Sequence, residues 1–180
     1  MTQPDLENLK YPIGNYKPKE TFTSDDIKWY INTIELFPAK IKQAVKDLSN
    51  EQLDTRYRPE GWTIRQVVHH VVDSHMNSYV RFKLALTEDN PTIMPYDEAL
   101  WSELPEAKTG PVELSLPLLE ALHRRWVAML KNITFEQTAR KLYHPGSKSD
   151  MTIASLMQLY AWHCDHHLAH IVNLKKTKGW

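Results

Sequence analysis

Hydrophobic side chains recur at helical spacing through four long segments of this 180-residue chain, and no segment alternates convincingly with a period of two. The segments cover approximately residues 24–48, 63–88, 114–130 and 152–178. A helix with one apolar face must bury that face against other helices. The pattern therefore predicts an all-α fold, a four-helix bundle, formed by one domain over residues 1–180.

Helix-start signals support these boundaries. Ser24, followed by two acidic residues, opens the first segment, where negative charge favours the positive end of a helix. Thr63 and Gln66 form a capping box for the second. Pro38 interrupts the first segment, so we expect a kink or a restart of the helix there.

The connections contain shorter elements. A short helix is expected at 96–104 and another after the capping box at 134–137, whereas 105–111 and 143–150 are expected to be loops. Residues 1–22 are rich in turn formers and predict an irregular N-terminal arm. Three apolar or aromatic side chains are candidates for holding this arm: Tyr11, Ile13 and Tyr16.

Charge and composition exclude several classes of protein. The 22 Lys and Arg residues balance 22 Asp and Glu residues, so we expect neither nucleic acid nor a membrane surface as a partner. Zero net charge is compatible with self-association. A single cysteine, together with the absence of a signal-peptide pattern or an 18-residue apolar stretch, favours a cytoplasmic location.

The feature that bears most on function is the clustering of histidines. Seven of the nine lie in two stretches, VVHHVVDSH at 67–75 and WHCDHHLAH at 162–170. His163 and His167 are four residues apart, which places two imidazoles on one helix face within reach of one metal ion. A third histidine from the other stretch would complete a three-ligand site with an open position, the layout of a catalytic metal.

Helical geometry alone leaves several ligand sets open. His170 lies beside His163 and His167 on the last helix, and His166 lies further out. On the second helix, His69 and Asp73 have correct spacing for a ligand pair. The alternative, His70, falls on a polar stripe that is either a solvated face or the wall of a wet cleft: Gln66, His70, Asp73, Asn77 and Arg81.

Longer motifs resemble a known family. The run GWTIRQVVHHVVDSHMNSY followed by WHCDHHLAHI resembles the DinB superfamily of metal-binding four-helix proteins. YPIGNYKP, PYDEALWSEL, LHRRW and YHP resemble its YfiT-type branch of metal-dependent hydrolases. The resemblance implies an up-down-down-up bundle, a homodimer, and one divalent metal per chain held by His70, His163 and His167. It also favours the cleft interpretation of the polar stripe.

Such a site would support more than one reaction. Zn²⁺ is the expected ion, with Ni²⁺, Mn²⁺ or Fe²⁺ as alternatives, and a bound water with a lowered pKa would hydrolyse a small-molecule substrate. A thiolate in the open position would instead fit transfer of a small thiol to an electrophile. The resemblance implies this alternative too, because some members of the superfamily are bacillithiol-type S-transferases. A non-catalytic bundle with a structural metal is the third reading.

The remaining candidates are weaker. Asp73 is the first candidate for a general base, with His166 and His170 as weaker ones, and a surface or supporting carboxylate is an equally good interpretation of Asp73. Cys164 points toward the apolar stripe, so we expect neither a ligand nor a nucleophile there. Among the tryptophans, Trp126 is expected in the core, Trp101 is a lid candidate, and Trp62 and Trp162 fit either a core or a pocket.

Overall fold

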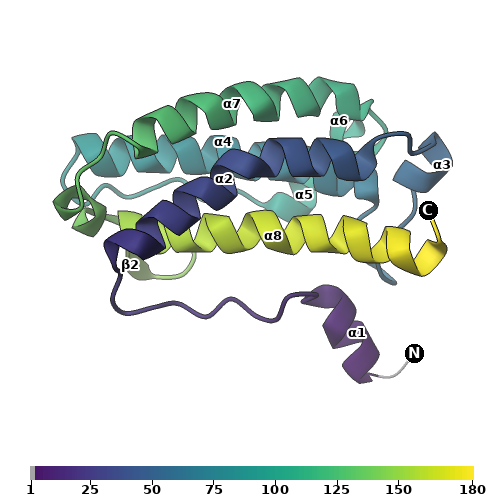
Figure 1. Ribbon diagram of the computed structural model, residues 1–180, viewed down its shortest axis with the longest axis horizontal. Coiled ribbons are helices and arrows are strands. Elements are labelled where there is room, and N and C mark those ends of the chain that lie inside the picture. Colours follow the sequence, from purple (N-terminus) through teal and green to yellow (C-terminus); the bar gives the residue numbers. More distant parts are fainter. Residues whose placement is uncertain (1–2) are drawn as a thin grey trace.

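A computed structural model describes residues 3–180 and shows the four long helices as a bundle (Figure 1). They are α2 (Ser24–Val45), α4 (Ile64–Thr87), α7 (Ser115–Leu130) and α8 (Ile153–Lys178). Helices α2 and α8 run in one direction and α4 and α7 in the other, which is the expected up-down-down-up order (Figure 1). Both α2 and α4 pack against α7 and α8, so the four helices enclose one core.

The predicted caps set the helix starts. The Thr63 hydroxyl accepts from the Gln66 N–H, and the Gln66 side chain accepts from the Thr63 N–H. Helix α2 begins at Ser24 as predicted, but its cap is Thr23, which exchanges the same pair of bonds with Asp26. Each box satisfies N–H groups that the first helical turn leaves unpaired.

Helix α2 continues through Pro38 without a restart. Figure 1 shows its axis changing direction midway, which is the kink that a proline imposes. A proline at position 38 has no N–H to donate to the carbonyl four residues earlier, that of Ile34.

The connections contain more regular structure than predicted. The short elements are α3 (Asn50–Leu53), α5 (Glu98–Ser102), α6 (Pro105–Lys108), the 3₁₀ helix η1 (Val112–Leu114) and the 3₁₀ helix η2 (Glu136–Ala139). The prediction of a loop over 105–111 was wrong for 105–108, because Pro105 occupies the first position of a helical turn, and it holds for 109–111.

The predicted loop at 143–150 is largely a hairpin. Strand β1 (Lys141–His144) pairs antiparallel with β2 (Ser149–Thr152). Each strand has only four residues, too few to establish a period of two in the sequence. The hairpin leads directly into α8, whose first turn is capped by the Thr152 hydroxyl.

The N-terminal arm is not wholly irregular as predicted, because it opens with α1 (Gln3–Lys10). The Tyr16 hydroxyl donates to the side-chain oxygen of Gln158 on α8 at 3.0 Å, and the Tyr11 ring lies 6.1 Å from that of His166. Ile13 is exposed and does not anchor the arm. The arm crosses the α8 face of the bundle (Figure 1).

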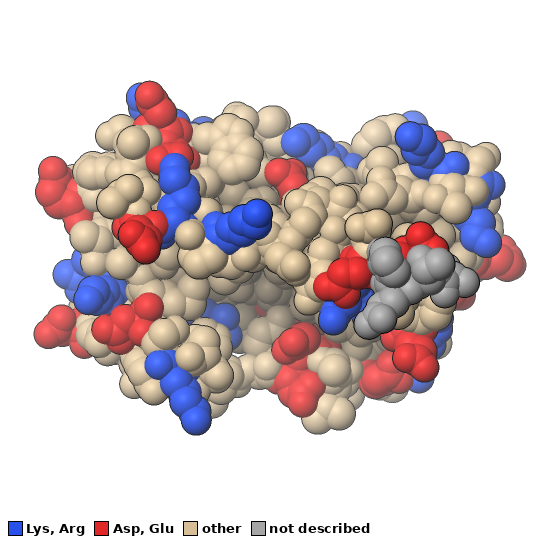
Figure 2. Space-filling view, turned by 90° about the horizontal axis from the view of Figure 1, so that it is seen from below, with Lys and Arg blue, Asp and Glu red and all other residues tan. Residues whose placement is uncertain are grey.

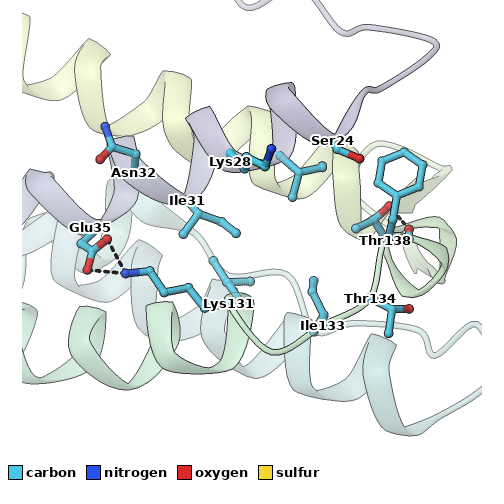
Figure 3. Close-up of a pocket in the computed structure, with 12 residues that line it drawn as sticks. Ser24, Lys28, Ile31, Asn32, Glu35, Lys131, Ile133, Thr134 and Thr138 are labelled. Carbon is cyan, nitrogen blue, oxygen red and sulfur yellow. Dashed lines mark hydrogen bonds and ion pairs between the residues drawn. The ribbon is translucent and has the colours of Figure 1, made fainter.

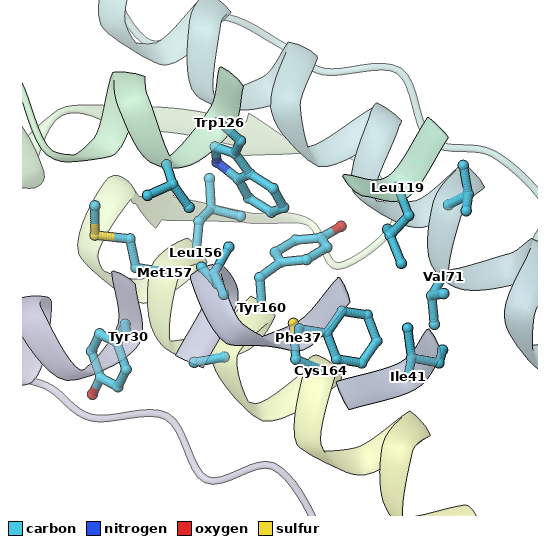
Figure 4. Packing of buried hydrophobic residues seen from close by; sticks show 14 of the residues in the cluster. Tyr30, Phe37, Ile41, Val71, Leu119, Trp126, Leu156, Met157, Tyr160 and Cys164 are labelled. Carbon is cyan, nitrogen blue, oxygen red and sulfur yellow. The ribbon is translucent and has the colours of Figure 1, made fainter. Parts of the chain in front are cut away.

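The core lies between the four helices (Figure 4). Trp126 is fully buried, as predicted, with its ring 5.5 Å from that of Tyr160. Cys164 is also buried, and burial raises the pKa of its thiol, so it is an inert core residue. No helix in the described part of the chain is long and apolar enough to cross a membrane.

One face of the surface and one of the cavities show no cluster of chemically reactive side chains among the described residues. Figure 2 shows basic and acidic side chains interspersed over one face, with a hollow near its middle. A cavity of about 470 Å³ lies between α2 and residues 130–138, beside the ion pair of Lys131 and Glu35 at 2.7 Å (Figure 3). None of the residues that line it is a histidine, a cysteine or an aspartate.

Candidate metal centre

Three histidines from two helices meet where α4 passes α8. One ring nitrogen each from His70, His163 and His167 lies within 4.8 Å of the others. The ring centres of His163 and His167 are 4.4 Å apart, as spacing of four on α8 requires, and His70 is 4.8 Å from His167. We call these three residues the inner triad.

A second group overlaps the first. Ring nitrogens of His166, His167 and His170 also lie within 4.8 Å of one another, and we call these residues the outer triad. His166 is buried between Trp162, at 4.3 Å between ring centres, and Tyr11 of the arm. The sequence analysis placed His166 away from the site, because helix geometry does not reveal that the arm covers this face.

The inner triad is connected to a chain of buried hydrogen bonds. Nδ1 of His163 lies 3.1 Å from Nε2 of His75, whose Nδ1 lies 2.7 Å from Nε2 of His123. Nδ1 of His123 lies 2.7 Å from the carbonyl oxygen of Ile34. The chain crosses from α8 through α4 and α7 to α2, so it joins all four helices of the bundle.

When the rings are neutral, the Ile34 carbonyl at the end of this chain determines which nitrogen of each histidine carries the proton. The oxygen of Ile34 can only accept, so His123 carries its proton on Nδ1 and accepts on Nε2. His75 must then donate from Nδ1 and accept on Nε2, which makes His163 the donor from its own Nδ1. Nε2 of His163 then carries no proton, and its one hydrogen-bond neighbour among the described residues is the Ser74 hydroxyl at 3.5 Å, a long contact that a metal would replace.

Pro38 leaves free the Ile34 carbonyl oxygen, the acceptor on which this chain of hydrogen bonds depends. Inside an α-helix the Ile34 carbonyl would normally accept from the N–H of residue 38, and proline has none. The carbonyl freed by the kink is the one that His123 reaches. The kink in α2 is therefore linked to the inner triad by a defined set of hydrogen bonds.

Burial keeps these histidines neutral, as metal ligands must be. It lowers the pKa of His70 to about 4 and that of His123 to about 4, and it lowers the pKa values of His75, His163 and His167 well below the ordinary range. Neighbouring imidazoles add to the effect at His163 and His167. Three neutral nitrogens at this spacing fit a divalent cation that prefers imidazole.

The triads form the floor of a cleft of about 560 Å³, a size that suits a small molecule. Its walls carry aromatic rings and cations from the arm, α4, α8 and the connecting loops. Besides the triads, the main lining residues are Tyr11, Tyr57, Trp62, Tyr96 and Trp162, with Arg58 and Arg81. Trp62 lies 4.4 Å from His70, ring centre to ring centre.

The alternative pair on α4 is not brought to a common site. Nδ1 of His69 lies 2.7 Å from the Ser115 hydroxyl, and its Nε2 lies 3.1 Å from the Gly110 carbonyl. These bonds join α4 to the start of α7. Neither His69 nor Asp73 belongs to a group of potential metal ligands in the described part of the chain.

The polar stripe on α4 divides between two roles. His70 and Arg81 line the cleft, whereas Gln66 is buried and donates to the Ser102 carbonyl on α5. Asp73 is not among the side chains that line the cleft, although burial raises its pKa to about 6. The expectation of a cleft wall therefore holds for part of the stripe only.

Comparison with known proteins identifies the family to which this fold and this histidine cluster belong. The model of the DinB superfamily matches residues 33–171. This chain belongs to the DinB superfamily. It is 52% identical to YfiT of Bacillus subtilis strain 168 over 173 residues, which cover 96% of this chain and 97% of the relative. A Bacillus cereus AH820 relative is 51% identical over 175 residues, covering 97% of this chain and all of the relative.

Both relatives carry the name "Putative metal-dependent hydrolase". The solved structure of Bacillus subtilis YfiT, whose title describes a probable metal-dependent hydrolase with an unusual four-helix bundle topology, superposes with a TM-score of 0.94. That match covers 96% of this chain and 99% of the YfiT chain. The fold predicted from helical periodicity is therefore the fold of the family.

Proposed function

We propose that this protein is a metal-dependent hydrolase of a small molecule, with one divalent ion, most simply Zn²⁺, bound by His70, His163 and His167. The observation that carries the proposal is the inner triad itself: three neutral imidazoles, two of them buried and His163 half-buried, with ring nitrogens within 4.8 Å of one another, lining a cleft. The names of the two relatives support hydrolysis as the reaction class.

The protein's own groups prepare the site. His75 and His123 hold His163 in one tautomer, so its Nε2 lone pair is available without a rearrangement of protons. Trp62 and Tyr57 narrow the approach and exclude part of the solvent. When bound, a divalent ion supplies Lewis acidity, which lowers the pKa of a coordinated water toward neutrality and polarises a carbonyl or phosphoryl oxygen.

The decisive experiment is a turnover screen of the zinc-loaded protein. Ester, amide and phosphate-ester substrates are tested with water alone, and electrophiles are tested with and without a small thiol. Hydrolysis that requires zinc and is lost in His163→Ala supports the proposal. Turnover only with thiol assigns the protein to the thiol transferases instead.

A second measurement separates catalysis from structure. If the metal only joins α4 to α8, removing it lowers the melting temperature sharply and no substrate is turned over. If the site is catalytic, the fourth position stays exchangeable, and small inhibitory anions perturb the visible spectrum of the Co²⁺-substituted protein. A saturated, unresponsive Co²⁺ spectrum contradicts the hydrolase proposal.

A further inference from the structure

Two buried arginines on α4 differ sharply in their partners. Arg65 is 4% exposed and Arg81 is 9% exposed, so each guanidinium is largely withdrawn from water. A buried charge is costly unless it is paired and hydrogen-bonded. The two side chains on one helix therefore provide an internal comparison of what a buried arginine requires in this protein.

Each of the three guanidinium nitrogens of Arg65 has a hydrogen-bond partner within the protein. Its Nε donates to the Asp54 carboxylate at 2.6 Å, its Nη1 to the Gly110 carbonyl at 3.0 Å, and its Nη2 to the Asn50 side chain at 2.9 Å. One anion and two neutral acceptors thus surround the cation. This arginine ties α3 and the loop before α7 to α4.

Arg81 has no such set. Its Nη2 donates to the Met94 carbonyl at 3.2 Å, and its buried Nε has no partner. Among the described residues, no carboxylate lies within ion-pair distance of Arg81 (4.0 Å). An always-charged group of this kind is left with one neutral acceptor.

The position of Arg81 indicates what completes its environment. It lines the same cleft as the inner triad, together with Tyr96 and His144. Burial lowers the pKa of His144, and the charge of Arg81 lowers it further, so His144 is neutral and the positive charge beside it is that of Arg81. The one carboxylate in the lining belongs to Glu98, which is exposed.

We infer that Arg81 binds an anionic oxygen group, a carboxylate or a phosphate, of the molecule that enters the cleft. A guanidinium donates two parallel N–H groups to such an anion, which matches the donors that the protein leaves unused. Anion binding by Arg81 does not depend on the proposed function. Only the further statement, that the reacting end of the same molecule lies at the inner triad, rests on it.

The spacing on α4 limits the length of such a substrate. Arg81 follows His70 by three helical turns, about 16 Å along the axis of α4. The anionic group therefore lies several bonds from the bond that reacts. Substrates whose charge adjoins that bond do not reach both points.

The test uses the metal-free protein, because anion binding at Arg81 does not need the metal. Inorganic phosphate and succinate are titrated separately at pH 7, and binding is followed by calorimetry and by the NMR signal of the arginine Nε–H. We expect saturable binding by the wild type of at least one of them and a loss of about tenfold to a hundredfold in affinity in Arg81→Met. Arg81→Lys keeps the charge and part of the affinity.

The matched control is Arg124→Met, because Arg124 lines a different cavity on α7. It should bind the anion like the wild type. The inference is overturned if the wild type binds neither anion, or if a folded Arg81→Met, checked by its melting temperature, binds them equally well. Failure of zinc binding or of turnover would overturn the proposed function and leave this anion result standing.

Discussion

The inner and outer triads share His167 and have the same number of imidazoles within the same 4.8 Å, yet their hydrogen bonds differ. In the inner triad, Nδ1 of His163 is bonded to His75 and, through His123, to a backbone carbonyl. In the outer triad, Nδ1 of His166, His167 and His170 is buried in each case and has no partner.

The difference separates two groups of histidines that proximity alone does not distinguish. A metal-binding imidazole needs one nitrogen with a free lone pair, and a partner on the second nitrogen fixes its tautomer. His163 has such a partner, whereas Nδ1 of His167, which both triads share, has none in the described part of the chain. In the outer triad, Nε2 of His170 lies 3.2 Å from the Lys10 carbonyl oxygen, and this hydrogen bond ties His170 to the arm.

The largest expected effect is loss of the metal. His163→Ala removes an inner ligand, and zinc affinity should fall by more than the tenfold to hundredfold that loss of an outer-shell partner costs. His166→Ala, the matched control one position from His167, should still bind one zinc per chain. Equilibrium dialysis with metal analysis distinguishes them, and loss of zinc in His166→Ala alone would move the site to the outer triad.

The next effect concerns pH. Two buried histidines, His70 of the inner triad and His123 of the hydrogen-bond chain, have pKa values of about 4 in the folded protein, against an ordinary 6.5. Both are neutral in either state above pH 6.5, but the unfolded chain takes up protons as the pH falls from 6.5 to 4. Stability of the metal-free protein should fall over this window, by on the order of 3 kcal/mol for each group.

Urea unfolding at a series of pH values measures this loss. His123→Leu removes one of the two groups, so its stability should depend less steeply on pH below 6.5. A wild-type free energy of unfolding that stays constant between pH 6.5 and 4 would show that these rings are not held neutral.

A smaller effect isolates the chain of hydrogen bonds. His123→Leu frees His75 from its partner, so His163 is no longer confined to one tautomer, and zinc affinity should fall about tenfold to a hundredfold. His69→Leu is the control, because His69 is also buried and hydrogen-bonded but lies outside the chain. Equal zinc affinities in the two variants would mean that the chain supports only the fold.

The smallest effect belongs to the outer triad. In the wild type the ring centres of His170 and Tyr57 are 3.9 Å apart. His170→Phe keeps an aromatic ring beside Tyr57 and loses the hydrogen bond to the Lys10 carbonyl. The cost should be about 1 kcal/mol, felt as faster amide hydrogen exchange in α1 and the arm. Unchanged exchange there would show that His170 does not hold the arm.

Much of the fold was predictable because it depends on local signals. The apolar stripes of four segments and the Thr63–Gln66 box specify where helices run, and both were confirmed. The hairpin at 141–152 and the helix α1 were missed, since short elements carry too few residues for a period to emerge. The ligand choice of His70 over His69 came from the resemblance, and spacing alone left it open.

The sequence by itself determined the four helices and the presence of two imidazoles on one face of α8, because both follow from the period of the helix. Only the tertiary structure placed His75 and His123 in line with His163, since they come from three helices whose contacts no local pattern records. It also decided that Pro38 frees a carbonyl for His123, and that Arg81 is buried without a counter-charge whereas Arg65 has one. Hydrogen bonds between distant segments depend on packing, and packing is a property of the assembled bundle.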